Sequence, residues 1–345
     1  MSNGKPGAQA LLEFLAHRGK EISPLLILTH NHPDPDAMGT ALTLAFLAEK
    51  LHGIRSRIAY GGIIGRIENQ TMARTLRIPI NPLREGDLQR YQNVALVDTQ
   101  PPFQNNPFKR RRKATVIIDH HPQHPSTLAD FIWIDETAGA TATLMAETLF
   151  SSGLEVPSRL ATALAYGIAS ETENLGREAG PRDVQAYLTL IQKSNTKALA
   201  RIQNPPRPPA FFGLLGRAIR DAFVLKDIIG VHLRDVPTPD RVSQMADFLL
   251  THEKMHWALC TGRFSGRLYV SLRSRKADAR AGRLLTRLLG LGKAGGHGMI
   301  AGGSAGMPDE ASENDWRDKE AEVTNGFLKI LGLHEPFDLQ HPFAS

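Results

Sequence analysis

The chain has 345 residues, of which 41% are hydrophobic and 22% charged, as in a packed globular protein that is too long for one hydrophobic core. Its only cysteine, Cys260, excludes an intrachain disulfide, and no apolar stretch is long enough for a membrane helix. We therefore expect a cytoplasmic protein of two domains. The net charge of +6 favours an anionic partner.

In the first half, short apolar runs alternate with segments of helical periodicity. Helices are expected at residues 9–17, 40–51, 67–77, 140–151 and 159–170, and strands at residues 25–28, 57–60, 94–97 and 115–118. This alternation is typical of a parallel sheet with crossover helices. Ligands of such sheets bind at the carboxyl ends of the strands, so the residues that follow the strands should meet at one edge.

The loop after the first strand, HNHPDPDAMG at residues 30–39, is rich in metal-binding side chains. Within seven positions it holds His30, His32, Asp34 and Asp36. Imidazole with carboxylate suits Mn, Zn or Fe, and several carboxylates suit Mn or Mg. A plain turn is also often rich in Asp and Pro, so this loop indicates a metal site only in combination with other groups.

Two later strand ends carry the same chemical groups. Asp98 directly follows one apolar run, and the triplet Asp119-His120-His121 follows the next. A lone Asp at a strand end is usually a cap or turn former, and paired histidines usually lie on the surface. Three such segments at one edge of a sheet together indicate a metal centre.

A proline-rich segment, NPPRPP at residues 204–209, marks the expected domain boundary because it cannot form a helix or a central strand. Alternating runs at residues 228–233, 257–261 and 268–272 then predict a second, mixed α/β domain. We assign the first domain to residues 1–195, a linker to residues 196–212 and the second domain to residues 213–345.

These motifs resemble the DHH phosphoesterase superfamily, through the loop HNHPDPDAMG, the strand end ALVDTQPP and the triplet in VIIDHH. Near the C-terminus, GGHGMIAG at residues 295–302, preceded by SLRS at residues 271–274, resembles the GGH motif of the partner domain called DHHA1. The resemblance implies a parallel-sheet DHH domain with flanking helices, a smaller mixed-sheet DHHA1 domain and an active-site cleft between them.

The resemblance also implies two divalent metal ions, Mn by preference with Mg or Co as alternatives. The implied ligands are His30, Asp34 and Asp98 for one ion, and Asp36, Asp98 and His120 for the other. Asp98 then bridges the two ions, an arrangement that stabilises both the attacking and the leaving oxygen. Two catalytic residues are implied beside the ligands, with Asp119 orienting His120 and His121 contacting a phosphate oxygen or the leaving group.

One metal ligand departs from the family pattern. Where the family has an Asp in a TDTG-like segment, this chain reads SETEN, and Glu171 is the aligned carboxylate. Its extra methylene moves the oxygens by ~1.5 Å, which is enough to change a coordination geometry. Glu173 adds a second carboxylate or a gate where glycine is customary. Metal preference and turnover therefore depend on Glu171.

The resemblance places substrate-binding residues in the second domain. They are Arg273, Ser274, Gly295, Gly296 and His297. The glycines allow backbone N–H groups to approach a phosphate, and the charged side chains add hydrogen bonds. For Arg280, Arg283 and Arg287 we expect a solvated helix face.

Among DHH proteins the chain most resembles nano-RNases that also act on 3′-phosphoadenosine 5′-phosphate. We expect a hydrolase whose partners are short single-stranded RNA or DNA, or nucleotides. A homodimer is a possible assembly, and no membrane partner is expected. Alternatives are a RecJ-like exonuclease or a cyclic-dinucleotide phosphodiesterase, which usually carry further regions, and an inorganic pyrophosphatase, which has a different second domain. A further alternative is not an enzyme in its main role: it is a nucleotide-binding regulator, in which Glu171 weakens catalysis.

Overall fold

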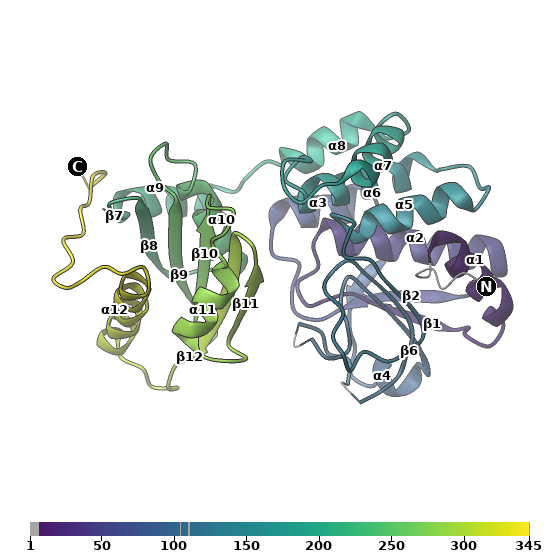
Figure 1. Ribbon diagram of the computed structural model, residues 1–345, viewed down its shortest axis with the longest axis horizontal. Coiled ribbons are helices and arrows are strands. Elements are labelled where there is room, and N and C mark those ends of the chain that lie inside the picture. The colour runs from purple at the N-terminus through teal and green to yellow at the C-terminus, as the bar shows by residue number, and fades with distance from the viewer. Residues whose placement is uncertain (1–6, 104, 110, 345) are drawn as a thin grey trace. The chain divides into compact units, whose positions relative to one another are not determined.

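The computed structural model describes residues 7–103, 105–109 and 111–344, and it divides into two compact units between Pro205 and Pro206 (Figure 1). The division falls within the segment that we assign to the linker. That segment also contains helix α8 (Thr196–Gln203) and the start of helix α9 (Pro209–Arg220). Pro209 can begin α9 because a proline at the first helical position leaves no required N–H unpaired.

The sheet of the first unit has six strands, in the order β3-β2-β1-β4-β5-β6, and every neighbouring pair is parallel. The strands are β1 (Leu25–Leu28), β2 (Ser56–Tyr60), β3 (Ile80–Pro82), β4 (Asn93–Val97), β5 (Ala114–Asp119) and β6 (Ala129–Ile134). The predicted parallel sheet is confirmed, and β3 and β6 extend it at its two edges. Strand order reverses between β1 and β4, which is where ligands bind in sheets of this kind.

Helices cover one face of this sheet much more fully than the other (Figure 1). They are α1 (Ala8–Arg18), α2 (Pro35–His52), α3 (Ile67–Thr75), α5 (Thr141–Ser151), α6 (Ser158–Glu171), α7 (Pro181–Ile191) and α8, whereas the short α4 (Asp87–Arg90) packs on the other face. A large apolar cluster joins most of them to alternate strand residues such as Ile27 and Val116. The remaining strand residues, such as Leu26 and Ile117, form a smaller cluster on the opposite face. Both faces are therefore buried, as parallel sheets require.

Helix α2 begins five residues earlier than the predicted helix at residues 40–51. Asp34 is its N-cap and accepts a hydrogen bond from the Ala37 backbone N–H at 3.0 Å, and Pro35 follows at the first helical position. Asp and Pro are favoured at these two positions, so the motif loop ends at the cap and Asp36 lies in the first helical turn.

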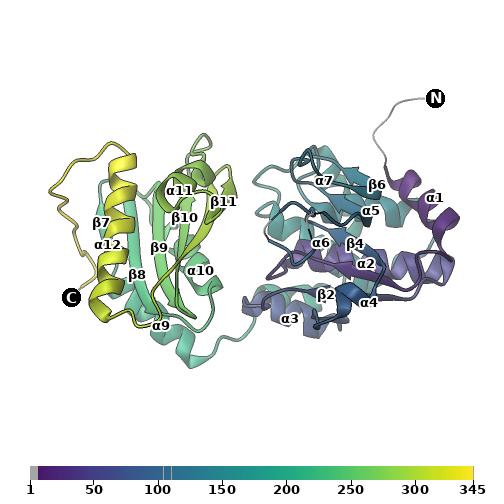
Figure 2. The same ribbon diagram turned by 90° about the horizontal axis from the view of Figure 1, so that it is seen from below.

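The second unit has a mixed six-stranded sheet in the order β11-β12-β10-β9-β8-β7, in which β8 and β9 are the parallel pair. Its strands are β7 (Phe223–Leu225), β8 (Ile228–Asp235), β9 (Trp257–Phe264), β10 (Arg267–Ser274), β11 (Ala294–His297) and β12 (Ile300–Gly306). Helices α9 and α10 (Asp240–Leu249) pack on one face, and α11 (Ala281–Leu289) and α12 (Glu313–Ile330) on the other (Figure 2). The predicted mixed α/β domain is confirmed.

Among the described residues, no helix combines the length and the apolar character that a membrane crossing needs.

Candidate metal centre

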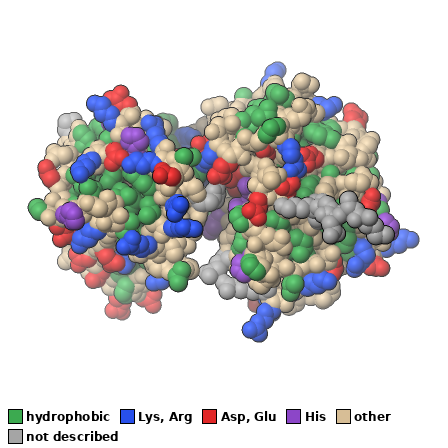
Figure 3. Space-filling view, viewed as in Figure 1, with side chains coloured by type: hydrophobic (Ala, Val, Ile, Leu, Met, Phe, Trp, Pro, Cys, Tyr) green, Lys and Arg blue, Asp and Glu red, His purple; other side chains and the backbone are tan. Residues whose placement is uncertain are grey.

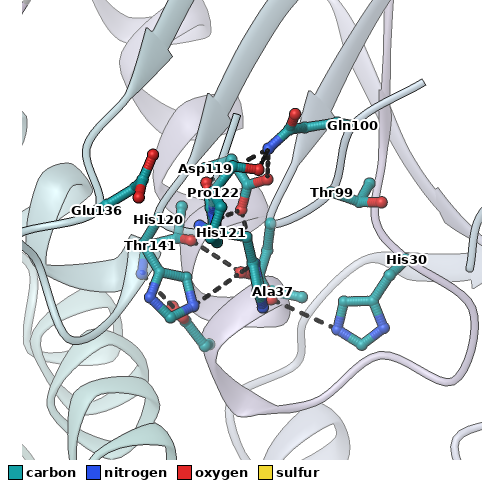
Figure 4. Close-up of polar contacts among 12 residues, drawn as sticks. His30, Ala37, Thr99, Gln100, Asp119, His120, His121, Pro122, Glu136 and Thr141 are labelled. Carbon is teal, nitrogen blue, oxygen red and sulfur yellow. Dashed lines mark hydrogen bonds and ion pairs between the residues drawn. The ribbon is translucent and has the colours of Figure 1, made fainter. Parts of the chain in front are cut away.

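Three neighbouring strands of the first unit deliver polar side chains to one edge of the sheet (Figure 4). His30 follows β1, Asp98 follows β4, and Asp119 is the last residue of β5. The pairing register aligns the ends of these strands, because Leu28 lies beside Leu96, and Val97 beside Ile118. Groups that are far apart in the sequence are therefore brought into contact by the sheet itself.

The first group of candidate ligands contains His30, Asp34 and Asp98, whose ligand atoms lie within 4.8 Å of one another. His30 Nε2 lies 3.5 Å from Asp34 Oδ2 and 3.4 Å from Asp98 Oδ2. His30 Nδ1 lies 2.8 Å from the carbonyl oxygen of Asn31, which favours a proton on Nδ1 and leaves Nε2 as the ligand atom. These are the three residues that the resemblance implies for one ion.

The imidazole and the carboxylates of this group shift one another's pKa values. Burial lowers the pKa of His30, but the carboxylates of Asp34 and Asp98 outweigh it and raise that pKa well above its usual value. Burial raises the pKa of Asp34, but His30 outweighs it and lowers that pKa to about 2. A half-buried carboxylate beside an imidazole is suited to bind a cation.

The second group contains Asp98, His120 and His121, so Asp98 belongs to both groups. Asp98 Oδ1 lies 3.7 Å from His120 Nε2 and 3.7 Å from His121 Nδ1. His120 Nδ1 lies 3.3 Å from the carbonyl oxygen of Ala138, and the buried Nε2 has no hydrogen-bond partner among the described residues. Buried polar atoms in folded proteins nearly always have a partner. The unpartnered nitrogen beside a carboxylate fits a metal ligand.

The implied second set differs from this group, because Asp36 and Glu171 stand outside it. Asp36 is buried, and its Oδ2 and Oδ1 accept hydrogen bonds from the backbone N–H groups of Thr141 at 2.8 Å and Ala142 at 2.6 Å. Burial and the neighbouring carboxylates of Asp98 and Asp34 raise the pKa of Asp36. Asp36 thus lies in the same anionic pocket while it anchors the start of α5.

Asp119 pairs with His121, whereas the implied partner was His120. Asp119 Oδ1 lies 2.9 Å from His121 Nδ1, and Asp119 Oδ2 accepts a hydrogen bond from Gln100 Nε2 at 2.8 Å. The His120 ring instead faces the loop after β6, where the Ala138 carbonyl oxygen lies near its Nδ1. Burial lowers the pKa of His121, but Asp119 outweighs it and raises that pKa to about 9. The Asp119 carboxylate therefore holds the His121 ring beside the candidate ligands.

Glu171 ends helix α6 with its carboxyl group in the anionic pocket. Burial, together with the carboxylates of Asp34 and Asp98, raises the pKa of Glu171 to about 7. The guanidinium of Arg177 donates to the backbone carbonyl oxygen of Glu171 at 2.7 Å and to Glu173 Oε1 at 2.6 Å. Glu173 is exposed and paired with Arg177, so it lies outside the pocket that Glu171 enters.

Two features of this centre gave no signal in the sequence. Asp98 has a backbone φ of 58°, a left-handed conformation that costs a non-glycine residue free energy and often marks functional sites. Thr141 donates from its hydroxyl to Asp98 Oδ1 at 2.8 Å. Threonine at a helix start is ordinary in sequence, and only the position of the α5 N-terminus beside Asp98 reveals the contact.

In the second unit, two of the expected substrate-binding residues make contacts within the fold. The buried Arg273 side chain donates to Asp247 Oδ1 at 2.5 Å and to Ser271 Oγ at 2.9 Å. The Ser274 hydroxyl donates to the carbonyl oxygen of His256 at 3.1 Å. These bonds hold β10 in place, because a guanidinium buried in a sheet must satisfy its donors locally.

The expected glycines border a pocket of about 440 Å³ on the same unit. Its lining residues are Gly282, Arg283, Thr286, Arg287, Leu291, Gly295 and Gly296. A Cβ atom at Gly296 would lie 2.2 Å from the Ile300 carbonyl oxygen, so close packing requires that glycine, whereas space is open at Gly295. Arg283 and Arg287 are exposed as expected, and they also line this pocket. The side chain of His297 lies outside the described part of the structure.

Comparison with known proteins assigns the first unit to a family. Residues 24–168 match the model of the DHH family, N-terminal domain. A protein of Methanocaldococcus jannaschii is 31% identical over 318 residues, which are 91% of this chain and 65% of that protein. The "Probable manganese-dependent inorganic pyrophosphatase" of Lactobacillus helveticus is 26% identical over 181 residues, 52% of this chain and 54% of that protein. The chain therefore spans less than two thirds of the length of both relatives.

Solved structures share the fold over nearly the whole chain. An exopolyphosphatase-related protein from Bacteroides fragilis matches with a TM-score of 0.69 at 13% identity, covering 96% of this chain and all of that one. Exonuclease RecJ bound to manganese matches with a TM-score of 0.51 at 14% identity, covering 94% and 95% of the two chains. Residues 24–168, which match the DHH family, N-terminal domain, contain both groups of candidate ligands.

Proposed function

We propose that this protein is a metal-dependent phosphoesterase that hydrolyses short oligonucleotides to mononucleotides and removes phosphate from 3′-phosphoadenosine 5′-phosphate. One observation carries the proposal. Two groups of histidine and aspartate ligands share the carboxylate of Asp98, and His120 Nε2 is buried beside that carboxylate without a partner.

The donor set fits two divalent ions of the Mn type, since it combines imidazole with carboxylate. His30, Asp34 and Asp98 would hold one ion. Asp98 and His120, with Asp36 and Glu171 in the same pocket, would hold the other. When bound, such ions make water a usable nucleophile near neutral pH and stabilise the developing charge on phosphate oxygens.

The residues beside the ligands supply proton transfer. Asp119 accepts hydrogen bonds from Gln100 and His121, which fixes the His121 ring against the sheet edge. Burial raises the pKa of Asp119, but the hydrogen bonds and charge of His121, with the hydrogen bond from Gln100, outweigh it and lower that pKa. His121 is therefore the residue that we assign to protonating the leaving oxygen.

The second unit supports a nucleotide substrate. Arg283 and Arg287 stand one helical turn apart beside the open backbone of Gly295, an arrangement suited to a phosphate group. Positive and negative side chains are interspersed on the face shown in Figure 3. The two arginines of this pocket are suited to one or a few phosphate groups, which favours a short substrate.

A substrate panel tests the proposal. The purified full chain is incubated with Mn²⁺ and di- to pentanucleotides of RNA and DNA, 3′-phosphoadenosine 5′-phosphate, cyclic dinucleotides or inorganic pyrophosphate. We expect mononucleotides and free phosphate from the first two classes, and no product from the Asp98→Asn variant. Asp130→Asn, which alters an exposed residue paired with Lys113, should remain active.

Other outcomes of the substrate panel would indicate other functions. Turnover of pyrophosphate or of cyclic dinucleotides, with the short oligomers left intact, would replace the proposed substrate. Tight binding of the nucleotide without hydrolysis in Mn²⁺ would make the protein a nucleotide-binding regulator.

A further inference from the structure

The first turn of helix α5 contacts several candidate ligands of the metal centre at once. The Thr141 hydroxyl donates to Asp98 Oδ1 at 2.8 Å, and the Thr141 backbone N–H donates to Asp36 Oδ2 at 2.8 Å. Three residues before Thr141, the carbonyl oxygen of Ala138 lies 3.3 Å from His120 Nδ1. Residues that follow β4 and β5, and a residue of α2, therefore all contact the short segment 138–141.

We propose that Thr141 is a positioning residue of the metal centre, whose hydroxyl fixes the orientation of the shared carboxylate of Asp98. The inference rests on the proposed metal-dependent function. It assigns Thr141 no contact with a metal ion or with substrate, because the residue acts through Asp98.

The carboxylate of Asp98 needs such a restraint. Its two oxygens serve different partners, since Oδ2 lies 3.4 Å from His30 Nε2 while Oδ1 lies 3.7 Å from His120 Nε2. Rotation about the last torsion of an aspartate is only weakly restricted. A hydrogen bond from a buried hydroxyl to Oδ1 is directional and selects one orientation of the carboxylate.

The helix that carries Thr141 is itself fixed by the centre. Residue Ala140 occupies the N-cap of α5 and offers no side-chain acceptor. Asp36 supplies that acceptor from helix α2, through its bonds to the N–H groups of Thr141 and Ala142. A carboxylate is favoured at a helix N-terminus by the exposed N–H groups and the helix dipole. The position of the hydroxyl is therefore set by a second residue of the same centre.

Three substitutions in the full chain test the proposal. Thr141→Val removes the hydroxyl with almost no change of shape and keeps the backbone bonds to Asp36, while Thr141→Ser keeps the hydroxyl. Thr148→Val is the matched control, because Thr148 is also fully buried in α5 but donates to the carbonyl oxygen of Leu144. Mn²⁺ affinity is measured by titration calorimetry, with circular dichroism to verify folding.

We expect Thr141→Val to weaken Mn²⁺ binding by roughly tenfold or more, the usual effect of losing a hydrogen bond that orients a ligand. Thr141→Ser should restore most of the affinity, and Thr148→Val should bind like the unmodified chain. Equal Mn²⁺ affinity for Thr141→Val and Thr148→Val would overturn the inference.

Two further outcomes are distinguishable. If the unmodified chain binds no Mn²⁺, the proposed function fails before the role of Thr141 is reached. If Thr141→Val does not fold, Thr141→Ala takes its place, since the smaller side chain fits the same space. Weak binding by Thr141→Ala with recovery in Thr141→Ser supports the positioning role, and unchanged binding by Thr141→Ala refutes it.

Discussion

The role of Glu171 depends on where its carboxyl group lies in the folded chain. Its alignment with the family aspartate is visible in the sequence, but the sequence does not show where the longer side chain goes. In the structure the carboxyl group is close enough to Asp34 and Asp98 that these carboxylates, together with burial, raise its pKa to about 7. Mutual repulsion among three carboxylates is relieved by a bound cation, which argues that Glu171 contributes to metal binding.

Neutralising Glu171 should therefore weaken the centre. We expect Glu171→Gln to lower Mn²⁺ affinity by at least about tenfold, because the pocket loses a negative charge beside the cation. Glu173→Gln is the matched control, since Glu173 is exposed and pairs with Arg177. Titration calorimetry at pH 8, where Glu171 is ionised, measures both variants. Indistinguishable affinities would show that Glu171 is no ligand.

At the scale of elements, helix α7 stabilises the loop that precedes α5, although it carries none of the candidate ligands. Its buried Asp183 accepts hydrogen bonds from the Gly139 N–H at 3.0 Å, the Gly180 N–H at 2.7 Å and the Thr143 hydroxyl at 2.5 Å. Gly139 lies between the carbonyl group that faces His120 and the start of α5. One carboxylate from α7 therefore holds the loop that orients the ligands.

The change Asp183→Asn tests this support. An amide cannot accept from all three donors, so a buried N–H or hydroxyl is left unpaired, and we expect the free energy of unfolding to fall by about 1–3 kcal/mol. Urea denaturation followed by circular dichroism measures the loss. The surface variant Asp130→Asn should differ from the unmodified chain by less than about 0.5 kcal/mol. Equal stability of both variants would contradict the assigned role of Asp183.

At the scale of the whole molecule, the apolar clusters divide as the two units do. Two clusters lie entirely within residues 8–202, and two lie within residues 211–343. All candidate metal ligands belong to the first unit. Each unit thus has its own core, and the candidate ligands lie in only one of them.

This division predicts an uneven response to metal. In calorimetric unfolding of the full chain we expect two transitions, of which Mn²⁺ raises only one. At a concentration of 100 times Kd, one bound ion stabilises its unit by about 2.7 kcal/mol. Chelation with EDTA should reverse the shift. A single transition, or an equal shift of both, would show that the two units unfold together.

The sequence determined the architecture and the location of the centre. Periodicity is a local property, so apolar runs between amphipathic segments are enough to predict a parallel sheet. Because successive parallel strands end at the same edge, His30, Asp98 and the triplet after β5 could be placed together without coordinates. The metal groups at that edge also carried the family resemblance.

Only the tertiary structure decided which atoms meet. The bond from Thr141 to Asp36 joins residues 105 positions apart, and no local pattern encodes it. The pairing of Asp119 with His121 depends on how the ring of His120 turns toward Ala138. The contacts of Arg273 within its sheet likewise follow from burial beside Asp247. Hydrogen bonds between distant segments depend on the packing of the whole unit, whereas periodicity reports only on neighbouring residues.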